Sequence, residues 1–260
     1  MIAKETRASE SNHWYDFDGQ PKYTVPSKKD GSPRATTLRD ARTMNLVPSV
    51  TTILNVAAKP ALIQWLQRQV LMAALTLPRN PTETEDEYIE RIMHDSKQEG
   101  KAAADKGTEI HEAIQGFYEG KGLGQYPVEV ATTSAKIRQK YGHQEWIAER
   151  SFAHDLGFGG KCDLHSKGIV LDIKTKEFSD PEEVVGYDEH LMQLAAYRVG
   201  LGMPDAVCAN VFVSRTNSNL VVIKEWTQDE LTKGFGMFHH LLQFWIIKNK
   251  YQPMRGKNAE

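Results

Sequence analysis

The chain has 260 residues, of which 40% are hydrophobic and 25% are charged, and its formal net charge is −2. These values are ordinary for globular proteins and exclude a disordered or fibrous class. The near-zero net charge gives no global basic surface, so a nucleic-acid partner would have to be held by local patches.

The cysteine content and the absence of targeting signals in the sequence indicate the cellular compartment in which we expect the protein. The two cysteines, Cys162 and Cys208, cannot build a four-thiolate cluster or a C-x-x-C pair. The sequence has no secretory signal and no apolar run long enough to span a bilayer. We therefore expect a soluble cytoplasmic protein with no membrane partner.

The N-terminal region begins with turn and cap signals. An Asp18-Gly19 pair between aromatic-rich arms predicts a short hairpin over residues 12–30. In "PSVTTIL", residues 48–54, Ser49 and Thr51 are candidate N-caps of a short helix. A helix N-terminus with hydroxyl groups also suits a phosphate.

Three longer helices are predicted next. The first covers residues 60–75, and its apolar side chains at helical spacing are Leu62, Trp65, Leu66 and Val70. The second is acidic and starts with the capping-box spacing of Thr84 and Glu87. The third, residues 106–120, ends at Gly120. The N-terminal third is thus expected to be mainly helical.

From residue 144 the pattern changes to short strands. Three consecutive strands are predicted in "QEWIAERSFAH", "GKCDLHS" and "IVLDIKTK". A helix over residues 188–202 follows, then two strands separated by "TNSN", and a last helix from Thr227 to about Tyr251. The helix over residues 188–202 is long enough to make the strands on either side of it parallel neighbours.

The segment "GIVLDIKTK", residues 168–176, reads as a buried strand that carries an aspartate and a lysine. Side chains alternate along a strand, so Asp172 and Lys174 point to one face and Ile173 to the other. A surface ion pair is the commoner explanation of such spacing. The apolar run before Asp172 favours a buried site instead.

A second carboxylate is expected opposite Asp172. If Lys167 and Gly168 form a two-residue turn, residues whose numbers sum to 335 are paired, and Asp163 faces Asp172. Like charges at paired positions repel each other, so a cation is expected between them. Oxygen ligands suit Mg²⁺ or Mn²⁺, and a metal beside the Lys174 ammonium is typical of phosphodiester hydrolysis.

Four motifs in register resemble the PD-(D/E)XK nucleases, specifically their RecB-like exonuclease branch. They are "GTEIH" (107–111), "GGKCD" (159–163), "LDIKTK" (171–176) and "QLAAY" (193–197). The resemblance covers roughly residues 100–215. "PSVTTIL" is also similar to the N-terminal segment of phage-encoded exonucleases and of the mitochondrial genome maintenance exonuclease.

This resemblance implies a fold and a division of the chain. The fold is a restriction-endonuclease-like α/β core, a mixed sheet with the element order αβββαβ flanked by helices. Residues 1–100 would form an N-terminal hairpin and helical region packed on this core. Residues 101–260 would form the nuclease core with the C-terminal helix.

The resemblance also implies roles for individual residues. The implied metal ligands are His111, Asp163, Asp172 and the carbonyl of Ile173. Lys174 is the implied catalytic lysine, and Gln193 and Tyr197 would position the DNA backbone. Tyr197 as a core residue and His111 as an ordinary histidine are the alternatives. Glu149 is a candidate additional acidic group, with a solvated strand end as the alternative.

The implied activity is that of a metal-dependent DNA exonuclease using one or two Mg²⁺ or Mn²⁺ ions and no iron–sulfur cluster. Its implied setting is recombination or DNA processing in a bacterium or phage-infected host cell, with a recombination or single-strand-binding protein as a candidate partner. A catalytically silent DNA-end scaffold and a structure-specific endonuclease are the alternatives. Candidate contacts to single- or double-stranded DNA are Ser49, Thr51, Lys136, Arg138, Lys140 and Arg215.

Overall fold

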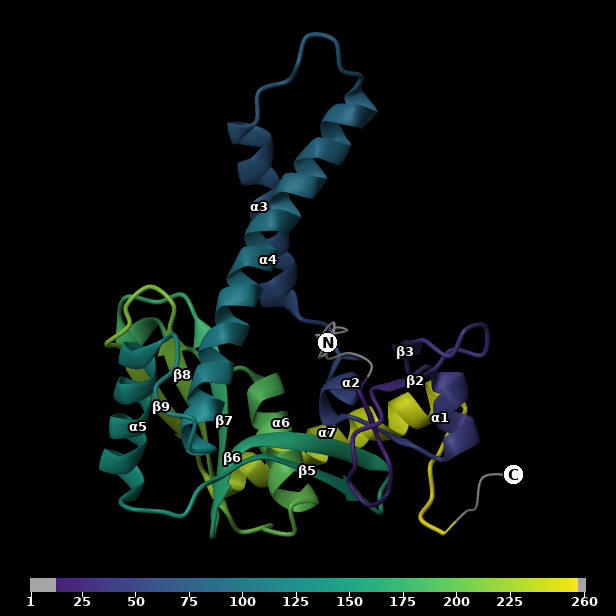
Figure 1. Ribbon diagram of the computed structural model, residues 1–260, viewed down its shortest axis with the longest axis vertical. Coiled ribbons are helices and arrows are strands. Elements are labelled where there is room, and N and C mark those ends of the chain that lie inside the picture. The colour runs from purple at the N-terminus through teal and green to yellow at the C-terminus, as the bar shows by residue number, and fades with distance from the viewer. Residues whose placement is uncertain (1–12, 257–260) are drawn as a thin grey trace.

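The computed structural model describes residues 13–256, and its central feature is a five-stranded sheet with the order β5-β6-β7-β8-β9 (Figure 1). All neighbours are antiparallel except β7 and β8, which are parallel as predicted. The strands are β5 (Ile147–His154), β6 (Phe158–Ser166), β7 (Ile169–Lys176), β8 (Val207–Ser214) and β9 (Val221–Trp226).

Helices cover both faces of this sheet. On one face, α4 and α5 enclose a core that includes Ile110, Ile137 and Leu171. On the other face, α6 and α7 pack over Cys162 and Val170. The helix bounds are α4 (Glu85–Tyr118), α5 (Pro127–Tyr141), α6 (Asp188–Gly200) and α7 (Gln228–Asn249), with a 3₁₀ turn η2 (Pro181–Glu183) before α6. The order α4, α5, β5, β6, β7, α6, β8 contains the predicted αβββαβ core, with the unpredicted helix α5 between the first helix and the first strand.

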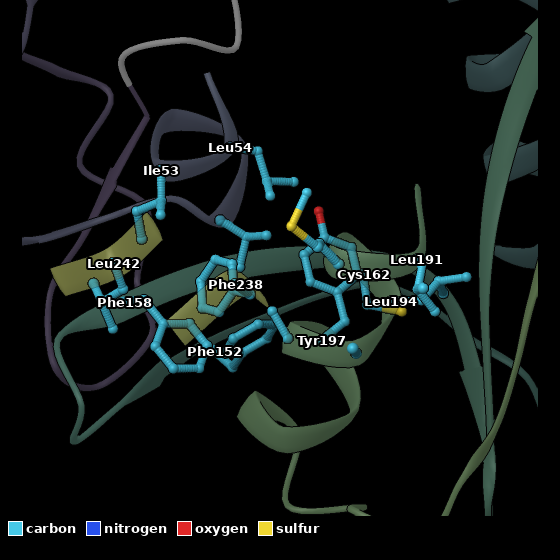
Figure 2. Close-up of a cluster of buried hydrophobic side chains, with 14 of the residues drawn as sticks. Ile53, Leu54, Phe152, Phe158, Cys162, Leu191, Leu194, Tyr197, Phe238 and Leu242 are labelled. Carbon is cyan, nitrogen blue, oxygen red and sulfur yellow. The ribbon is translucent and has the colours of Figure 1, made fainter. Parts of the chain in front are cut away.

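Short N-terminal elements complete the second core. Leu54 of α2 packs with Tyr197 and Phe238 there (Figure 2). All the N-terminal elements are β1 (Trp14–Tyr15), β2 (Thr24–Pro26), β3 (Pro33–Ala35), α1 (Leu38–Met44), β4 (Val47–Pro48), α2 (Val50–Leu54) and α3 (Pro60–Thr76). The N-terminal part of the core comes from β1, α1, α2 and the loop residues beside them. Within the described residues, no helix is long and apolar enough to cross a membrane.

The predicted N-terminal hairpin forms only in part. The turn at Gly19 exists, with φ +78°, but the chain returns to β1 through a single bridge between Tyr15 and Pro21. The main partner of β1 is β4, and β2 pairs with β3 instead. The reason is burial, because Trp14 and Tyr15 lie inside the core, where a longer surface hairpin would not place them. Residue 12 of the predicted range lies outside the described residues.

The second and third predicted helices are one helix of 34 residues, α4. The residues between them, "SKQEGKAAAD", are mostly strong helix formers, so Gly100 alone does not break the helix. The capping box of Thr84 and Glu87 starts α4 as predicted. The helix therefore runs through residue 100, where the sequence suggested the division between the N-terminal region and the core.

Helix α3 forms where it was predicted, but its apolar stripe is not buried. Leu62 and Leu66 are each 48% exposed, and Trp65 is also exposed. Helix α3 packs mainly against the first half of α4, and together they project from the body (Figure 1). With only one helix beside it, α3 cannot bury a full apolar face.

Candidate active site

The pairing of β6 and β7 follows the predicted register. The observed partners are Leu164–Leu171, His165–Val170 and Ser166–Ile169. Gly168 adopts φ +78° in the turn, which glycine tolerates without strain. The ladder stops before Asp163, and the Asp163 carboxylate accepts a hydrogen bond from the Ile173 backbone N–H at 2.7 Å. A side chain thus replaces the next backbone bond of the ladder.

The backbone is kinked at the point where Asp163 leaves the ladder. The flanking pairs of β5 and β6 place Glu149 opposite Asp163, and Glu149 has φ +56°. Cys162 packs on the α6 face of the sheet, whereas Leu164 packs on the α4 face. Residues two apart on a regular strand share a face, so the alternation breaks at Asp163. Such backbone strain clusters at functional sites.

Three acidic or imidazole groups meet at this kink. Ligand atoms of His111, Glu149 and Asp163 all lie within 4.8 Å of one another. The His111 Nε2 atom is 3.1 Å from the Asp163 Oδ2 atom. One imidazole and two carboxylates form a donor set that suits Mn²⁺ or Mg²⁺. The side chains come from α4, β5 and β6, which explains why sequence spacing alone does not reveal the group.

The Glu149 carboxylate has a second neighbour, because Lys161 forms an ion pair with it. Lys161 lies on β6, two residues before Asp163. Glu149 was predicted only as a candidate additional acidic group, and in the structure it belongs to the cluster with His111 and Asp163.

Asp172 and Lys174 share a face, as predicted. The Lys174 Nζ atom donates to Asp172 Oδ1 at 2.9 Å and to Gln193 Oε1 at 3.0 Å. Asp172 is fully buried, which excludes a solvent-exposed surface pair. Since the Ile173 N–H binds Asp163, this ion pair lies beside the three-residue cluster.

Helix α6 carries Gln193, the second hydrogen-bond acceptor of the Lys174 ammonium. The Gln193 Nε2 atom donates to the Tyr197 hydroxyl at 2.9 Å, across one helical turn. The Tyr197 ring is buried against Phe152 (Figure 2). Tyr197 is therefore a core residue through its ring and a member of the polar network through its hydroxyl.

The charges in this group shift one another's pKa values. Burial raises the pKa of Asp172 to about 6, and the Asp163 charge adds to this while Lys174 opposes it. Burial lowers the pKa of His111, but the Asp163 charge and hydrogen bond outweigh it and raise the value to about 9. His111 in turn holds the pKa of Asp163 low against the effect of burial. A protonated His111 thus balances the Asp163 carboxylate.

The His111 shift predicts a pH dependence of stability in EDTA. Because the folded-state pKa of about 9 exceeds the unfolded value near 6.5, the stabilising contribution is complete below pH 6.5 and is lost as pH rises through 9. The free energy of unfolding from urea titrations should fall across this window and be flatter in His111→Gln. The same slope in both proteins would contradict the assignment. The destabilisation from Asp172 develops at lower pH, between about 4 and 6.

Sequence analysis did not predict two residues that are hydrogen-bonded to Asp172 directly or through a neighbour, Asn210 and Trp226. The buried Asn210 donates through Nδ2 to Asp172 Oδ2 at 2.7 Å and accepts from the Trp226 indole N–H at 2.8 Å. Asn210 is the direct partner of Asp172 in the parallel pairing of β7 and β8. The available signal was a single amide within the apolar run "AVCANVFV".

Replacing Asn210 by alanine should raise the pKa of Asp172 further, because a donor to its ionised form is lost. The acidic limb of the pH–rate profile should then move to higher pH. Trp226→Phe removes only the indole donor to Asn210 and should shift the limb less. An unchanged acidic limb in Asn210→Ala would show that Asn210 does not tune Asp172.

The six candidate DNA contacts do not gather in one place. Thr51 lines a cavity of about 230 Å³ together with Lys174, Gln193 and His190. Ser49 is buried and caps α2 by accepting from the Thr52 N–H. On α5, which lies along β8 and β9 at the far side of the sheet from β5, the exposed basic residues are Lys136, Arg138 and Lys140.

Arg215 contacts α4, where its guanidinium donates to the Ala103 carbonyl, and it pairs with Glu177. Lys106 of α4 donates to the Arg215 carbonyl at 2.7 Å. These contacts fix α4 against the end of β8, so Arg215 has a structural role here.

The glycine of "GTEIH" lets α4 approach β7 closely. A Cβ atom at Gly107 would overlap the Thr175 hydroxyl. We predict that Gly107→Ala lowers the free energy of unfolding by about 1–3 kcal/mol in urea titrations. Gly116→Ala on the same helix meets only ordinary contacts and should be neutral or slightly stabilising. Equal effects of the two substitutions would contradict the close approach.

Comparison with known proteins finds only distant structural similarity. No protein-family model matches the chain, and no curated protein matches it. A candidate exonuclease of Eubacterium rectale aligns over 58% of this chain and 71% of its own, with 15% identity and a TM-score of 0.40. The alkaline exonuclease LHK-Exo of Laribacter hongkongensis aligns over 72% and 97%, with 13% identity and a TM-score of 0.34. The site is therefore interpreted from its own residues.

Proposed function

We propose that this protein is a metal-dependent DNA exonuclease that hydrolyses phosphodiester bonds from DNA ends. The observation that supports this most directly is a buried aspartate–lysine pair beside a cluster of one histidine and two carboxylates. A buried ion pair is weak evidence for stability alone, so a chemical role explains it better. The order of the four motifs supports the same conclusion.

The donor set fits a hard divalent cation. His111 Nε2 and the carboxylates of Glu149 and Asp163 would hold it. By the resemblance, Asp172 and the Ile173 carbonyl would join them. When bound, Mg²⁺ or Mn²⁺ supplies Lewis acidity at the phosphodiester. His111 must be neutral to act as a ligand, so its proton leaves on binding.

Lys174 carries the second part of the chemistry. Its ammonium, held by Asp172 and Gln193, would neutralise the negative charge that builds on the phosphoryl oxygens and orient the attacking water. The Gln193 amide donates to Tyr197, so its carbonyl oxygen faces Lys174. The α6 pair therefore fixes the position of the ammonium before the substrate binds.

The DNA-end specificity and the biological setting come from the resemblance. The Q-x-x-x-Y pair of Gln193 and Tyr197 favours end processing, and recombination or DNA processing in phage or bacteria is the proposed setting. A recombination or single-strand-binding protein is the proposed protein partner. A cytoplasmic location follows from this role.

The test is degradation of end-labelled linear DNA, single- and double-stranded, beside covalently closed circles, with Mg²⁺, Mn²⁺ or EDTA. We expect metal-dependent shortening of linear DNA and intact circles. Cleavage of circles would instead indicate an endonuclease. Binding of ends without cleavage in any metal would indicate a scaffold protein.

A further inference from the structure

The α3–α4 arm, α3 with the first half of α4, is a two-helix projection with very little interior (Figure 1). Among the described side chains of α3, only Ala73 is buried. On α4 the matching buried residues are Ile92 and Ser96. Two helices alone cannot enclose a core, so the remaining apolar side chains stay in solvent.

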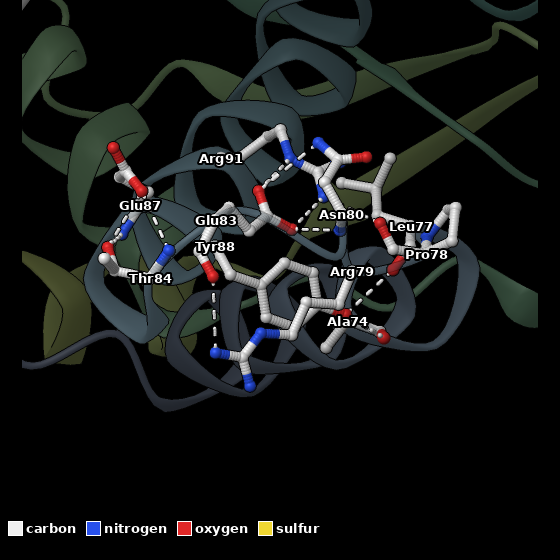
Figure 3. Close-up of polar contacts among 10 residues, drawn as sticks. All are labelled: Ala74, Leu77, Pro78, Arg79, Asn80, Glu83, Thr84, Glu87, Tyr88 and Arg91. Carbon is white, nitrogen blue, oxygen red and sulfur yellow. Dashed lines mark hydrogen bonds and ion pairs between the residues drawn. The ribbon is translucent and has the colours of Figure 1, made fainter.

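The tip of the arm is nevertheless held by a network of polar contacts (Figure 3). Arg91 pairs with Glu83 at 2.8 Å and donates to the Pro78 carbonyl at 2.7 Å. The Tyr88 hydroxyl donates to the Leu77 carbonyl at 2.8 Å. These contacts and the capping box at the start of α4 hold the two helices together. The arm is therefore a fixed element that presents its apolar surface in a defined geometry.

The exposed apolar side chains are large and numerous. Leu71 and Leu75 are 65% and 81% exposed. The full set on the arm is Leu62, Ile63, Trp65, Leu66, Leu71, Met72, Leu75, Ile89 and Met93. Each of these nine side chains is at least 37% exposed, and a standard interface takes roughly 800 Å² from each partner. Large exposed apolar surfaces mark interaction sites.

The two helices of the arm carry opposite charge. Residues 41–82 contain no aspartate or glutamate, and Arg68 is the single charged residue within α3. Helix α4 opens with Glu85, Asp86 and Glu87, and Glu90 follows on its exposed surface. An apolar helix with one basic residue and a helix that begins with acidic residues are thus joined in one arm. Such a surface is complementary to a second copy of itself.

We propose that two copies of this chain associate through their α3–α4 arms to form a four-helix bundle. Four helices enclose a core that two cannot, and the exposed leucines would fill it. In a two-fold arrangement, α3 of one copy packs on α4 of the other, which brings the apolar helix with its single basic residue against the acidic helix. Nucleic acid suits this surface less well, because the acidic residues of α4 repel phosphates.

The test is the molar mass in solution, measured by light scattering after size exclusion at several concentrations. The wild type should have about twice the chain mass of 29.4 kDa at micromolar concentration. Leu71→Glu combined with Leu75→Glu should give a single-chain mass, because neither side chain supports the fold of the monomer. Unchanged circular dichroism would show that the variant is folded.

Ile247→Glu is the matched control, since Ile247 on α7 is 75% exposed and lies outside the arm. The control should remain dimeric. A wild type with single-chain mass up to about 100 μM would overturn the proposal. So would a dimer that survives the double substitution or is broken by the control. The readout is mass, so it is independent of the proposed nuclease activity.

Discussion

Replacing Lys174 by alanine should lower the rate of DNA hydrolysis by at least about 100-fold, the usual cost of losing one group that stabilises developing charge. Lys174 is the cation that Asp172 and Gln193 hold beside the cluster, at 2.9 and 3.0 Å. The loss should appear in the single-turnover rate on labelled linear DNA. Binding of the DNA end should change little.

A second effect of this substitution must be separated from the first. Lys174 opposes the rise in the pKa of Asp172, so its removal raises that pKa further above about 6. Assays at pH 6.5 and at pH 9 distinguish the two, because Asp172 would regain its charge at the higher pH. If activity returns at pH 9, Lys174 serves only to keep Asp172 ionised.

Lys176→Ala is the matched control for Lys174→Ala. Lys176 lies two residues further along β7, and its ammonium is 5.3 Å from the centre of the Tyr187 ring. Lys176→Ala should retain activity within a few fold, because among the described interactions the Lys176 ammonium contacts none of the three carboxylates of the site, Glu149, Asp163 and Asp172. Equal losses at Lys174 and Lys176 would mean that general positive charge, rather than the specific pair, supports the reaction.

Asp163→Asn should abolish binding of Mn²⁺ and lower hydrolysis by at least about 100-fold. The amide keeps the size of the side chain and can still accept from the Ile173 N–H, so the fold should persist. The charge that keeps the pKa of His111 near 9 is lost, and that pKa should fall. Calorimetry with Mn²⁺ and the NMR titration of the His111 ring measure these two effects.

Asp155→Asn is the control for this charge removal. Asp155 lies in the turn between β5 and β6 and pairs with Arg255 at the surface. Its replacement should leave metal binding unchanged. If Asp163→Asn still binds Mn²⁺ with wild-type affinity, the cluster of His111, Glu149 and Asp163 is not the metal site.

The sheet was predictable because its signals are local. The turn at Lys167 and Gly168 fixes the β6–β7 register, which holds as far as the Leu164–Leu171 pair. The predicted direct pairing of Asp163 with Asp172 does not form, because Asp163 leaves the ladder and binds the Ile173 N–H instead. The parallel pairing of β7 and β8 followed from the length of the crossover that contains α6. The single helix α4 was less predictable, because separate helices were expected from the capping box at Thr84 and over residues 106–120, and the high helix propensity of the residues between them joins the two.

The other residues of the site, Glu149 and Asn210, reach it through contacts between segments that are far apart in the sequence. Glu149 reaches the cluster through a left-handed backbone conformation that no sequence pattern announces. Asn210 meets Asp172 only because β8 lies beside β7. The apolar residues of α3 recur at helical spacing, which correctly predicts a helix. Spacing does not show whether another element covers the apolar residues, and on α3 they are exposed. The sequence therefore predicted that Asp172 and Lys174 share a face, but it did not predict the contact of Asn210 with Asp172 or the place of Glu149 in the cluster.

The most direct test of a metal centre at this kink is anomalous diffraction from crystals grown with Mn²⁺. We predict a manganese peak at about 2.0–2.2 Å from His111 Nε2 and from an Asp163 oxygen, with the direct contact between these two side chains broken. Manganese bound elsewhere, with the 3.1 Å contact of His111 and Asp163 intact, would contradict the assignment. The group would then be a structural ion pair.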